Sequence, residues 1–141
     1  MRLMDRVRDA MVVDPPQLDG SASAQEAGEA LNRPEVRAVF VSHEDRFLGV
    51  VTRKTLVREV VAAGRDPRTT TLREIAEEAL NTIGSELPLD EAFQFLEEHD
   101  LERVAVLEEG RLVGVLSRAV LQRRLAEDEP PADDEASQQQ V

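Results

Sequence analysis

The chain has no cysteine, so it can form no disulfide, thiolate nucleophile or cysteine-ligated zinc site. It also has no long apolar run, and nothing approaches the roughly 20 residues that a membrane-spanning helix needs. The N-terminus carries charged residues such as Arg2, Asp5 and Arg6 and shows no apolar signal segment. These absences favour a cytoplasmic protein with no membrane association.

Catalytic motifs are absent as well. The chain has no Gly-x-Ser-x-Gly elbow, no Walker-type loop and no histidine cluster. Its two histidines, His43 and His99, fall in predicted loops without a carboxylate at metal-ligand spacing, and we expect both to be surface residues. A catalytic carboxylate pair could be drawn from the 29 acidic residues, but the composition singles none out. We therefore predict neither an enzyme nor a metal site.

Basic residues are scarce relative to acidic ones, and Lys54 is the only lysine. The formal charge of −12 would repel phosphate backbones, so we expect no nucleic-acid partner. About half of that charge follows Ala126, where the acidic segment 127–141 is predicted to be disordered. The abundance of arginine, alanine and valine is typical of bacteria with GC-rich genomes. Adaptation to high salt is the alternative explanation for the acid excess.

A duplication is the main feature that is present. Gly49-Val50-Val51-Thr52-Arg53 recurs 65 residues later as Gly114-Val115-Leu116-Ser117-Arg118. Further positions match at the same offset: Leu18 with Ile83, Leu31 with Leu96, Val39 with Val104, Glu44 with Glu109 and Arg58 with Arg123. So many matches in one register indicate two copies of one structural unit.

The residue pattern predicts the elements of each copy. We expect a helix within 2–11, an extended piece at 17–18, a hairpin around 42–45 and a helix from Arg53 to Gly64. Capping-box spacings predict two further helix starts: Ser23 with Glu26, and Thr71 with Glu74. The second of these begins a linker helix with one apolar face and with Glu77-Glu78 on its solvated face. That apolar face comprises Leu72, Ile75, Ala76, Ala79 and Leu80.

These elements predict an α+β fold (α/β by some schemes), in which each unit has a small sheet and two helices. A unit of about 50 residues cannot bury its apolar surface alone, so two units should pack as a pseudo-two-fold pair with equivalent clefts. The expected divisions are an N-terminal arm at 1–16, a first unit at 17–64, a linker helix at 65–81, a second unit at 82–126 and an acidic tail at 127–141.

The duplicated Gly-x-(Val/Leu)-(Thr/Ser) motif, the segment Val7-Arg8-Asp9-Ala10-Met11 and the linker pair Asp66-Pro67 resemble the cystathionine β-synthase (CBS) domain pair, or Bateman module. The likeness covers roughly residues 7–126. It implies tandem CBS units that form a homodimer, bind an adenine nucleotide or adenosyl ligand in a cleft, and gate a partner protein.

The family motif places a hydroxyl residue at the end of the last strand and an aspartate three residues later. Here Thr52 and Ser117 hold the hydroxyl positions, whereas Thr55 and Val120 stand at the aspartate positions. Thr55 could still hydrogen-bond a ribose hydroxyl and Val120 could not, so the second cleft is the weaker candidate. A structural alternative for Thr52 and Ser117 is that each only caps a helix.

The resemblance also implies further ligand contacts. The phosphates would meet Lys54 and Arg118, although both could equally be solvated charges. The base would lie against apolar residues of the two clefts: Leu18, Ala22 and Val39 in one, and Ile83, Leu87 and Val104 in the other.

We therefore predict a regulatory module that requires no cofactor, senses AMP, ADP, ATP or S-adenosylmethionine, and signals to a separate protein partner. The alternative is a degenerate pair that acts as a dimerisation or docking scaffold without a ligand. Loss of both aspartates favours that alternative.

Overall fold

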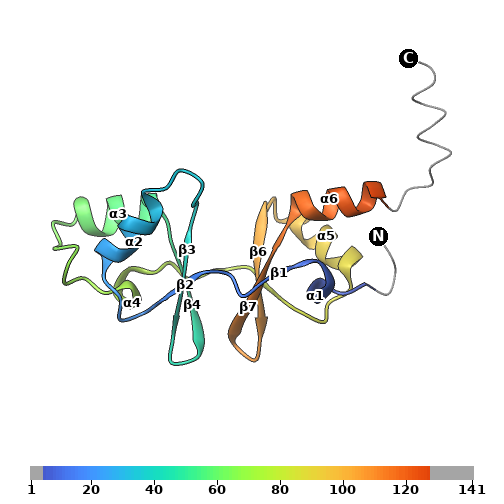
Figure 1. The fold of residues 1–141 in the computed structure, drawn as a ribbon, viewed down its shortest axis with the longest axis horizontal. Coiled ribbons are helices and arrows are strands. Elements are labelled where there is room, and N and C mark those ends of the chain that lie inside the picture. The colour runs from blue at the N-terminus through green and yellow to red at the C-terminus, as the bar shows by residue number, and fades with distance from the viewer. Residues whose placement is uncertain (1–4, 128–141) are drawn as a thin grey trace, which may run out of the picture.

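The computed structural model describes residues 5–127. It has two lobes, each with a sheet near the middle of the molecule and helices at its outer end (Figure 1). In the part of the chain that the structure describes, no helix is long and apolar enough to cross a bilayer. The predicted tail at 127–141 lies almost entirely outside the described residues.

The first unit contains a three-stranded sheet in the order β2-β3-β4. Its strands are β2 (Gln17–Asp19), β3 (Val39–His43) and β4 (Arg46–Val51), with β2 parallel and β4 antiparallel to β3. Three helical segments belong to this unit: α2 (Ala24–Leu31), α3 (Arg53–Leu56) and the π-helix η1 (Val57–Val61), which continues α3. The capping box predicted at Ser23 is confirmed, because Ser23 Oγ accepts from Glu26 N at 3.2 Å.

The second unit contains a four-stranded sheet in the order β1-β7-β6-β5. Its strands are β1 (Val12–Val13), β5 (Thr82–Gly84), β6 (Arg103–Glu108) and β7 (Arg111–Ser117). Helices α5 (Leu89–Glu98) and α6 (Arg118–Glu127) cover this sheet. Both units thus have the predicted order of elements, and the predicted α+β class is confirmed.

The two units exchange their leading segments. Helix α1 (Val7–Ala10) and β1 precede the first unit in sequence but lie in the lobe of the second, while α4 (Leu72–Ile75) lies in the lobe of the first (Figure 1). Val7 is fully buried in the core of the second unit, and Leu72 is fully buried in the core of the first. Helices α1 and α4 begin 65 residues apart, so the exchanged segments are equivalent parts of the two sequence repeats.

Two glycines of the repeated motif make room for the exchanged segments. A Cβ at Gly49 would lie 2.0 Å from the backbone oxygen of Glu77, and one at Gly114 would lie 2.5 Å from Met11 Sδ. Glu77 pairs with Val50 on β4, just as Val12 pairs with Val115 on β7. Each glycine therefore allows a crossing segment to lie flat on the last strand of its sheet.

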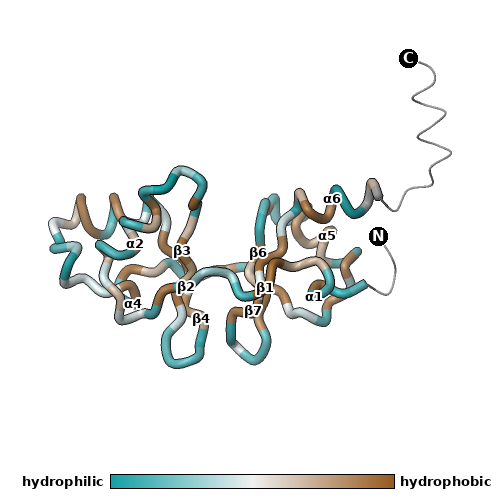
Figure 2. Tube along the Cα trace, in the orientation of Figure 1, coloured by the Kyte–Doolittle hydropathy of each residue, from teal (hydrophilic) through white to brown (hydrophobic). Residues whose placement is uncertain are grey.

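The apolar residues form two separate cores, one in each lobe, whereas the hairpin tips are hydrophilic (Figure 2). The β3–β4 turn places Glu44 and Asp45 at positive φ, as does the β6–β7 turn for Glu109 and Gly110. Two successive left-handed residues are typical of tight hairpins. The predicted hairpin around 42–45 is therefore confirmed.

The linker differs from its prediction. Helix α4 has one turn only, begun by Glu74 Oε2 accepting from Thr71 N at 2.9 Å, and it ends before Glu77. The chain leaves the helix because Glu77 exchanges two backbone hydrogen bonds with Val50, of 2.8 and 2.9 Å. Leu80 is consequently 89% exposed rather than packed on a helix face.

Candidate functional site

The predicted site residue Thr52 begins α3 as its N-cap. Thr52 Oγ1 accepts a hydrogen bond from Thr55 N at 3.3 Å, and Thr55 Oγ1 accepts one from Thr52 N at 3.0 Å. The two hydroxyl oxygens lie 3.0 Å apart. Thr55 is fully buried, whereas Thr52 is half-buried. The reciprocal bonds satisfy amides at the helix start and fix both hydroxyls in place.

Glu77 joins these threonines from the linker. Thr55 Oγ1 donates to Glu77 Oε1 at 3.1 Å, and Arg58 donates to the same carboxylate oxygen. We call Thr52, Thr55, Arg58 and Glu77 the Thr52 cluster. The sequence pattern predicted that Glu77 would lie on a solvated helix face, which is wrong, because its backbone is paired with β4.

The corresponding position in the second unit is much less polar. Ser117 Oγ accepts from Val120 N at 3.1 Å, so Ser117 caps α6. Val120, the counterpart of Thr55, has no hydroxyl that could hydrogen-bond Ser117 or a carboxylate. The counterpart of Glu77, paired with the equivalent residue of the last strand, is Val12. The second unit therefore brings no carboxylate to its repeated motif from either of these positions.

The two predicted phosphate contacts differ in their environment. Lys54 is exposed in the first turn of α3, two residues after Thr52. Arg118 instead has an 18% exposed side chain that donates to the carbonyl of Leu96 at 2.9 Å and lies 3.7 Å from the Asp100 carboxylate. A cation that binds the last carbonyls of a helix stabilises its C-terminus, and Arg118 does this for α5.

Arg53 has the same role in the first unit. Its guanidinium donates to the carbonyl oxygens of Leu31 at 2.6 Å and Arg33 at 2.8 Å, at the end of α2. The repeated arginine therefore connects the start of one helix to the end of another in both units.

The residues predicted to contact a base belong mainly to the two cores. Val39, Ile83 and Val104 are buried, with exposures of 5%, 7% and 3%. The others are partly buried against those cores: Leu18 and Ala22 in the first unit, and Leu87 in the second. The structure thus divides the predicted set between the two lobes, with Thr52, Lys54, Thr55, Leu18, Ala22 and Val39 in the first.

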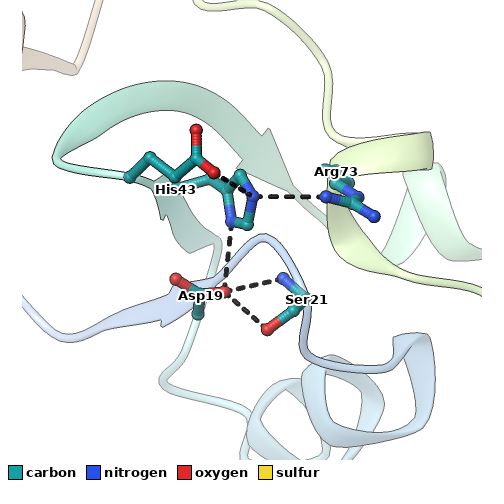
Figure 3. A network of polar contacts seen from close by, with 5 residues as sticks. Asp19, Ser21, His43 and Arg73 are labelled. Atoms are coloured by element: carbon teal, nitrogen blue, oxygen red, sulfur yellow. Dashed lines mark hydrogen bonds and ion pairs between the residues drawn. The ribbon is translucent and has the colours of Figure 1, made fainter.

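His43 is the centre of a second polar group in the first unit (Figure 3). Its Nδ1 lies 3.2 Å from Asp19 Oδ2, and its Nε2 lies 3.2 Å from Arg73 Nη1. Because an arginine can only donate, Nε2 is the acceptor and Nδ1 carries the proton that is donated to Asp19. The side chain is 22% exposed, so His43 lies partly at the surface, and it ends strand β3 rather than lying in the predicted loop.

Hydrogen bonds to Asp19 favour its ionised form. The hydroxyl of Ser21 donates to Oδ2 at 2.6 Å, and the backbone amide of Ser21 donates at 2.8 Å. Together with the weaker contribution of His43, they lower the pKa of Asp19 to about 2. The network joins the end of β2, the β3–β4 hairpin and the linker helix α4.

The second unit has a polar cavity of about 770 Å³ at the equivalent place. The residues 65 positions after Asp19 and His43 are Gly84 and Glu108, and Glu108 accepts from Ser85 Oγ at 2.5 Å. Arg8, the counterpart of Arg73, pairs with Glu86 at 2.6 Å instead. Arg8, Gly84 and Glu108, the counterparts of Arg73, Asp19 and His43, all line this cavity.

A second cavity, of about 630 Å³, is an apolar groove between α2 and the α3–η1 helix. Val60 and Val61 line it, and Val61 is 73% exposed. Neither cavity is lined by Thr52 or Ser117. Among residues 5–127, no three histidine or acidic side chains are grouped so that they could hold a metal ion.

The chain is similar to proteins of known sequence and structure. Hypoxic response protein 1 of Mycobacterium tuberculosis is 36% identical over 84 residues, which is 60% of this chain and 59% of that protein. The aligned part is thus less than two thirds of the relative's length. A crystal structure of Hypoxic Response Protein I, with two coordinated zinc ions, superposes with a TM-score of 0.72 and 28% identity, covering 86% of this chain and 99% of the other.

The fold is also that of CBSX2 in complex with AMP, with a TM-score of 0.68 and 20% identity over 86% of this chain and 96% of that one. The family model described as CBS domain matches twice, at residues 7–62 and 72–127. Both matches begin with the exchanged helices α1 and α4, at the 65-residue offset read from the sequence. The chain therefore belongs to the CBS domain family and carries two CBS domains in tandem.

Proposed function

We propose that the protein is a non-enzymatic regulatory module that binds an adenine nucleotide or S-adenosylmethionine at the Thr52 cluster and signals to a separate protein. The observation that carries this proposal is a fixed hydroxyl (Thr52) linked through Thr55 to a carboxylate (Glu77), with an exposed cation (Lys54) in the same helix turn. A phosphate and a ribose need these complementary groups. We place this activity in the bacterial cytoplasm.

The second unit supports the choice of the first. Arg118 is bound to the end of α5, and Val120 and Val12 bring no carboxylate. We therefore propose one ligand per chain. The apolar residues Leu18 and Ala22 lie partly buried on the same lobe and would supply contacts for the base.

Isothermal calorimetry with AMP, ADP, ATP and S-adenosylmethionine tests this proposal. We expect heat of binding with at least one of them, and a rise in melting temperature equivalent to about 2.7 kcal/mol at 100 times the dissociation constant. Thr52→Val should weaken binding about tenfold, since it removes a polar contact, while Thr52→Ser and Ser117→Ala should not. No binding by the folded, unaltered chain would refute the proposal.

We also propose a homodimer formed through the apolar groove. Val57 and Val61 are 55% and 73% exposed, and large exposed apolar residues side by side are typical of interfaces. Glu29 on α2 and Arg65 after η1 lie on opposite sides of this groove, so a two-fold axis would pair each with the other in the partner copy. Sedimentation should show a dimer that Val61→Glu disrupts, while Leu80→Glu, at an exposed leucine outside the groove, leaves it intact.

The scaffold alternative rests on one observation. Thr55 is fully buried, and its hydroxyl is already engaged by Thr52 and Glu77. A scaffold would keep these internal bonds in all states, would dimerise, and would show no change in melting temperature with any of the four compounds.

A further inference from the structure

The chain has no aspartate at the position where the resemblance would place a ribose contact, and Thr55, which stands there, cannot replace it. Thr55 is 0% exposed, and its hydroxyl lies between Thr52 Oγ1 at 3.0 Å and Glu77 Oε1 at 3.1 Å. A ligand outside the fold could not reach that hydroxyl. The nearest carboxylate to it comes from a different segment, the linker.

The position of this carboxylate is fixed by the backbone. Glu77 donates to and accepts from Val50 through hydrogen bonds of 2.8 and 2.9 Å, two residues before Thr52. The missing side chain at Gly49 is what permits this contact, since a Cβ there would lie 2.0 Å from the Glu77 carbonyl oxygen. The linker is thus held on β4 and directs Glu77 towards the start of α3.

The carboxylate retains capacity to bind. Its hydrogen bonds with Thr55 and Arg58 both use Oε1, and among residues 5–127 no hydrogen bond reaches Oε2. The side chain is 42% exposed, so this second oxygen is open to a solute. Two adjacent hydroxyl groups donate two hydrogen bonds, which an ionised carboxylate is well suited to accept.

From these contacts we infer that Glu77 is the residue that accepts the ribose hydroxyls of the ligand and so determines its preference for a ribonucleotide. The inference rests on the proposed nucleotide-binding function and assigns the recognition of the sugar to the linker. Thr55 and Arg58 act as positioning residues that hold the Glu77 carboxylate. The second unit has no equivalent, because Val12 and Val120 occupy the corresponding places.

The opposite role for Glu77 would be occlusion. In that case the Glu77 carboxylate would repel a phosphate bound near Thr52, and removal of the carboxylate would strengthen binding of the nucleotide. The two roles predict effects of opposite sign on affinity, so one set of titrations separates them.

The test compares the adenine nucleotide that binds the unaltered chain with its 2′-deoxy and 3′-deoxy counterparts by calorimetry. We expect the ribonucleotide to bind at least about tenfold more tightly than either deoxy form, as for the loss of a hydrogen bond to a charged group. Glu77→Ala should reduce this preference to less than about twofold, mainly by weakening the ribonucleotide. Glu78→Ala, the exposed neighbour, is the matched control and should preserve the preference.

Melting curves of both variants establish that they are folded. Unchanged discrimination in Glu77→Ala, or tighter binding of the ribonucleotide, would overturn the inference while leaving the nucleotide-binding proposal intact. Failure of the unaltered chain to bind AMP, ADP, ATP or S-adenosylmethionine would overturn both.

Discussion

The two units of this protein share their framework and differ in their polar clusters. In both, a glycine receives a crossing segment and an arginine connects the start of one helix to the end of another. In the first unit the remaining polar positions form two separate hydrogen-bonded groups, one around Thr52 and one around His43. In the second unit Val120 and Glu108 stand at the positions of Thr55 and His43, and Glu108 lines a cavity of about 770 Å³.

This difference separates architectural from functional constraints. The backbone contacts of Gly49 and Gly114 determine how the halves fit together, so both copies need them whatever they bind. The hydroxyl, carboxylate and imidazole groups are not needed for that fit, which leaves each unit free to diverge. The asymmetry supports our proposal that the first unit carries ligand recognition.

Substitution of the two glycines should cause the largest loss of stability and so tests the shared framework. Gly49→Ala should destabilise the protein by about 3 kcal/mol or more, because the new Cβ meets the backbone of Glu77 and φ at this position is 154°. Gly114→Ala should cost about 2 kcal/mol, since the closest contact is the flexible Met11 side chain at 2.5 Å and the nearest backbone atom, Val12 O, lies 2.9 Å away rather than 2.0 Å. Urea unfolding measures both, and equal losses would contradict this account of the crossing segments.

The repeated arginines should show a smaller difference between the units. Arg53→Ala removes two hydrogen bonds to helix-end carbonyls and should lower the free energy of unfolding by about 2 kcal/mol. Arg118→Ala removes one such bond and should cost about 1 kcal/mol. If Arg118→Ala instead abolished nucleotide binding without loss of stability, Arg118 would be a phosphate ligand rather than a helix cap.

Much of the fold was predictable from the sequence because its signals are local and occur twice. Ser23 and Glu26 marked a helix start, and the 65-residue offset identified the two units. The linker was mispredicted because Leu72, Ile75, Ala76, Ala79 and Leu80 have helical spacing, whereas pairing of Glu77 with Val50 ends the helix after one turn. That pairing joins residues far apart in sequence, and no local pattern encodes it.

The repeat itself contained the missing signal. Carried 65 residues forward, the short helix at the N-terminal arm predicts a short helix at 72–75 followed by an extended segment, as observed. The same offset places Glu77 opposite Val12, on the last strand of a sheet. For the site, Thr52 and Lys54 were identified from the motif, while Glu77 required the tertiary structure.

The smallest expected effect concerns pH and the His43 group. The pKa of Asp19 is lowered from 3.8 to about 2, so its ionised form stabilises the folded state above about pH 4, and this stabilisation is lost as the pH falls towards 2. Asp19→Asn should therefore lose less stability than the unaltered chain over that acid range, as measured by urea unfolding at several pH values. Gly84→Asp in the second unit should not reproduce the effect, because Glu86 stands there in the place of Ser21 and offers no hydroxyl to the new carboxylate. Parallel acid profiles for Asp19→Asn and the unaltered chain would contradict the role given to Ser21 and His43.

We propose that the two units are unequal and that only the first recognises a ligand. The number of adenine nucleotides bound per chain, measured by calorimetric titration to saturation, tests it most directly. We predict one nucleotide per chain, with Thr52→Val weakening that single site and Ser117→Ala leaving it unchanged. Two equivalent sites per chain, or one site that depends on Ser117 and not on Thr52, would contradict the account.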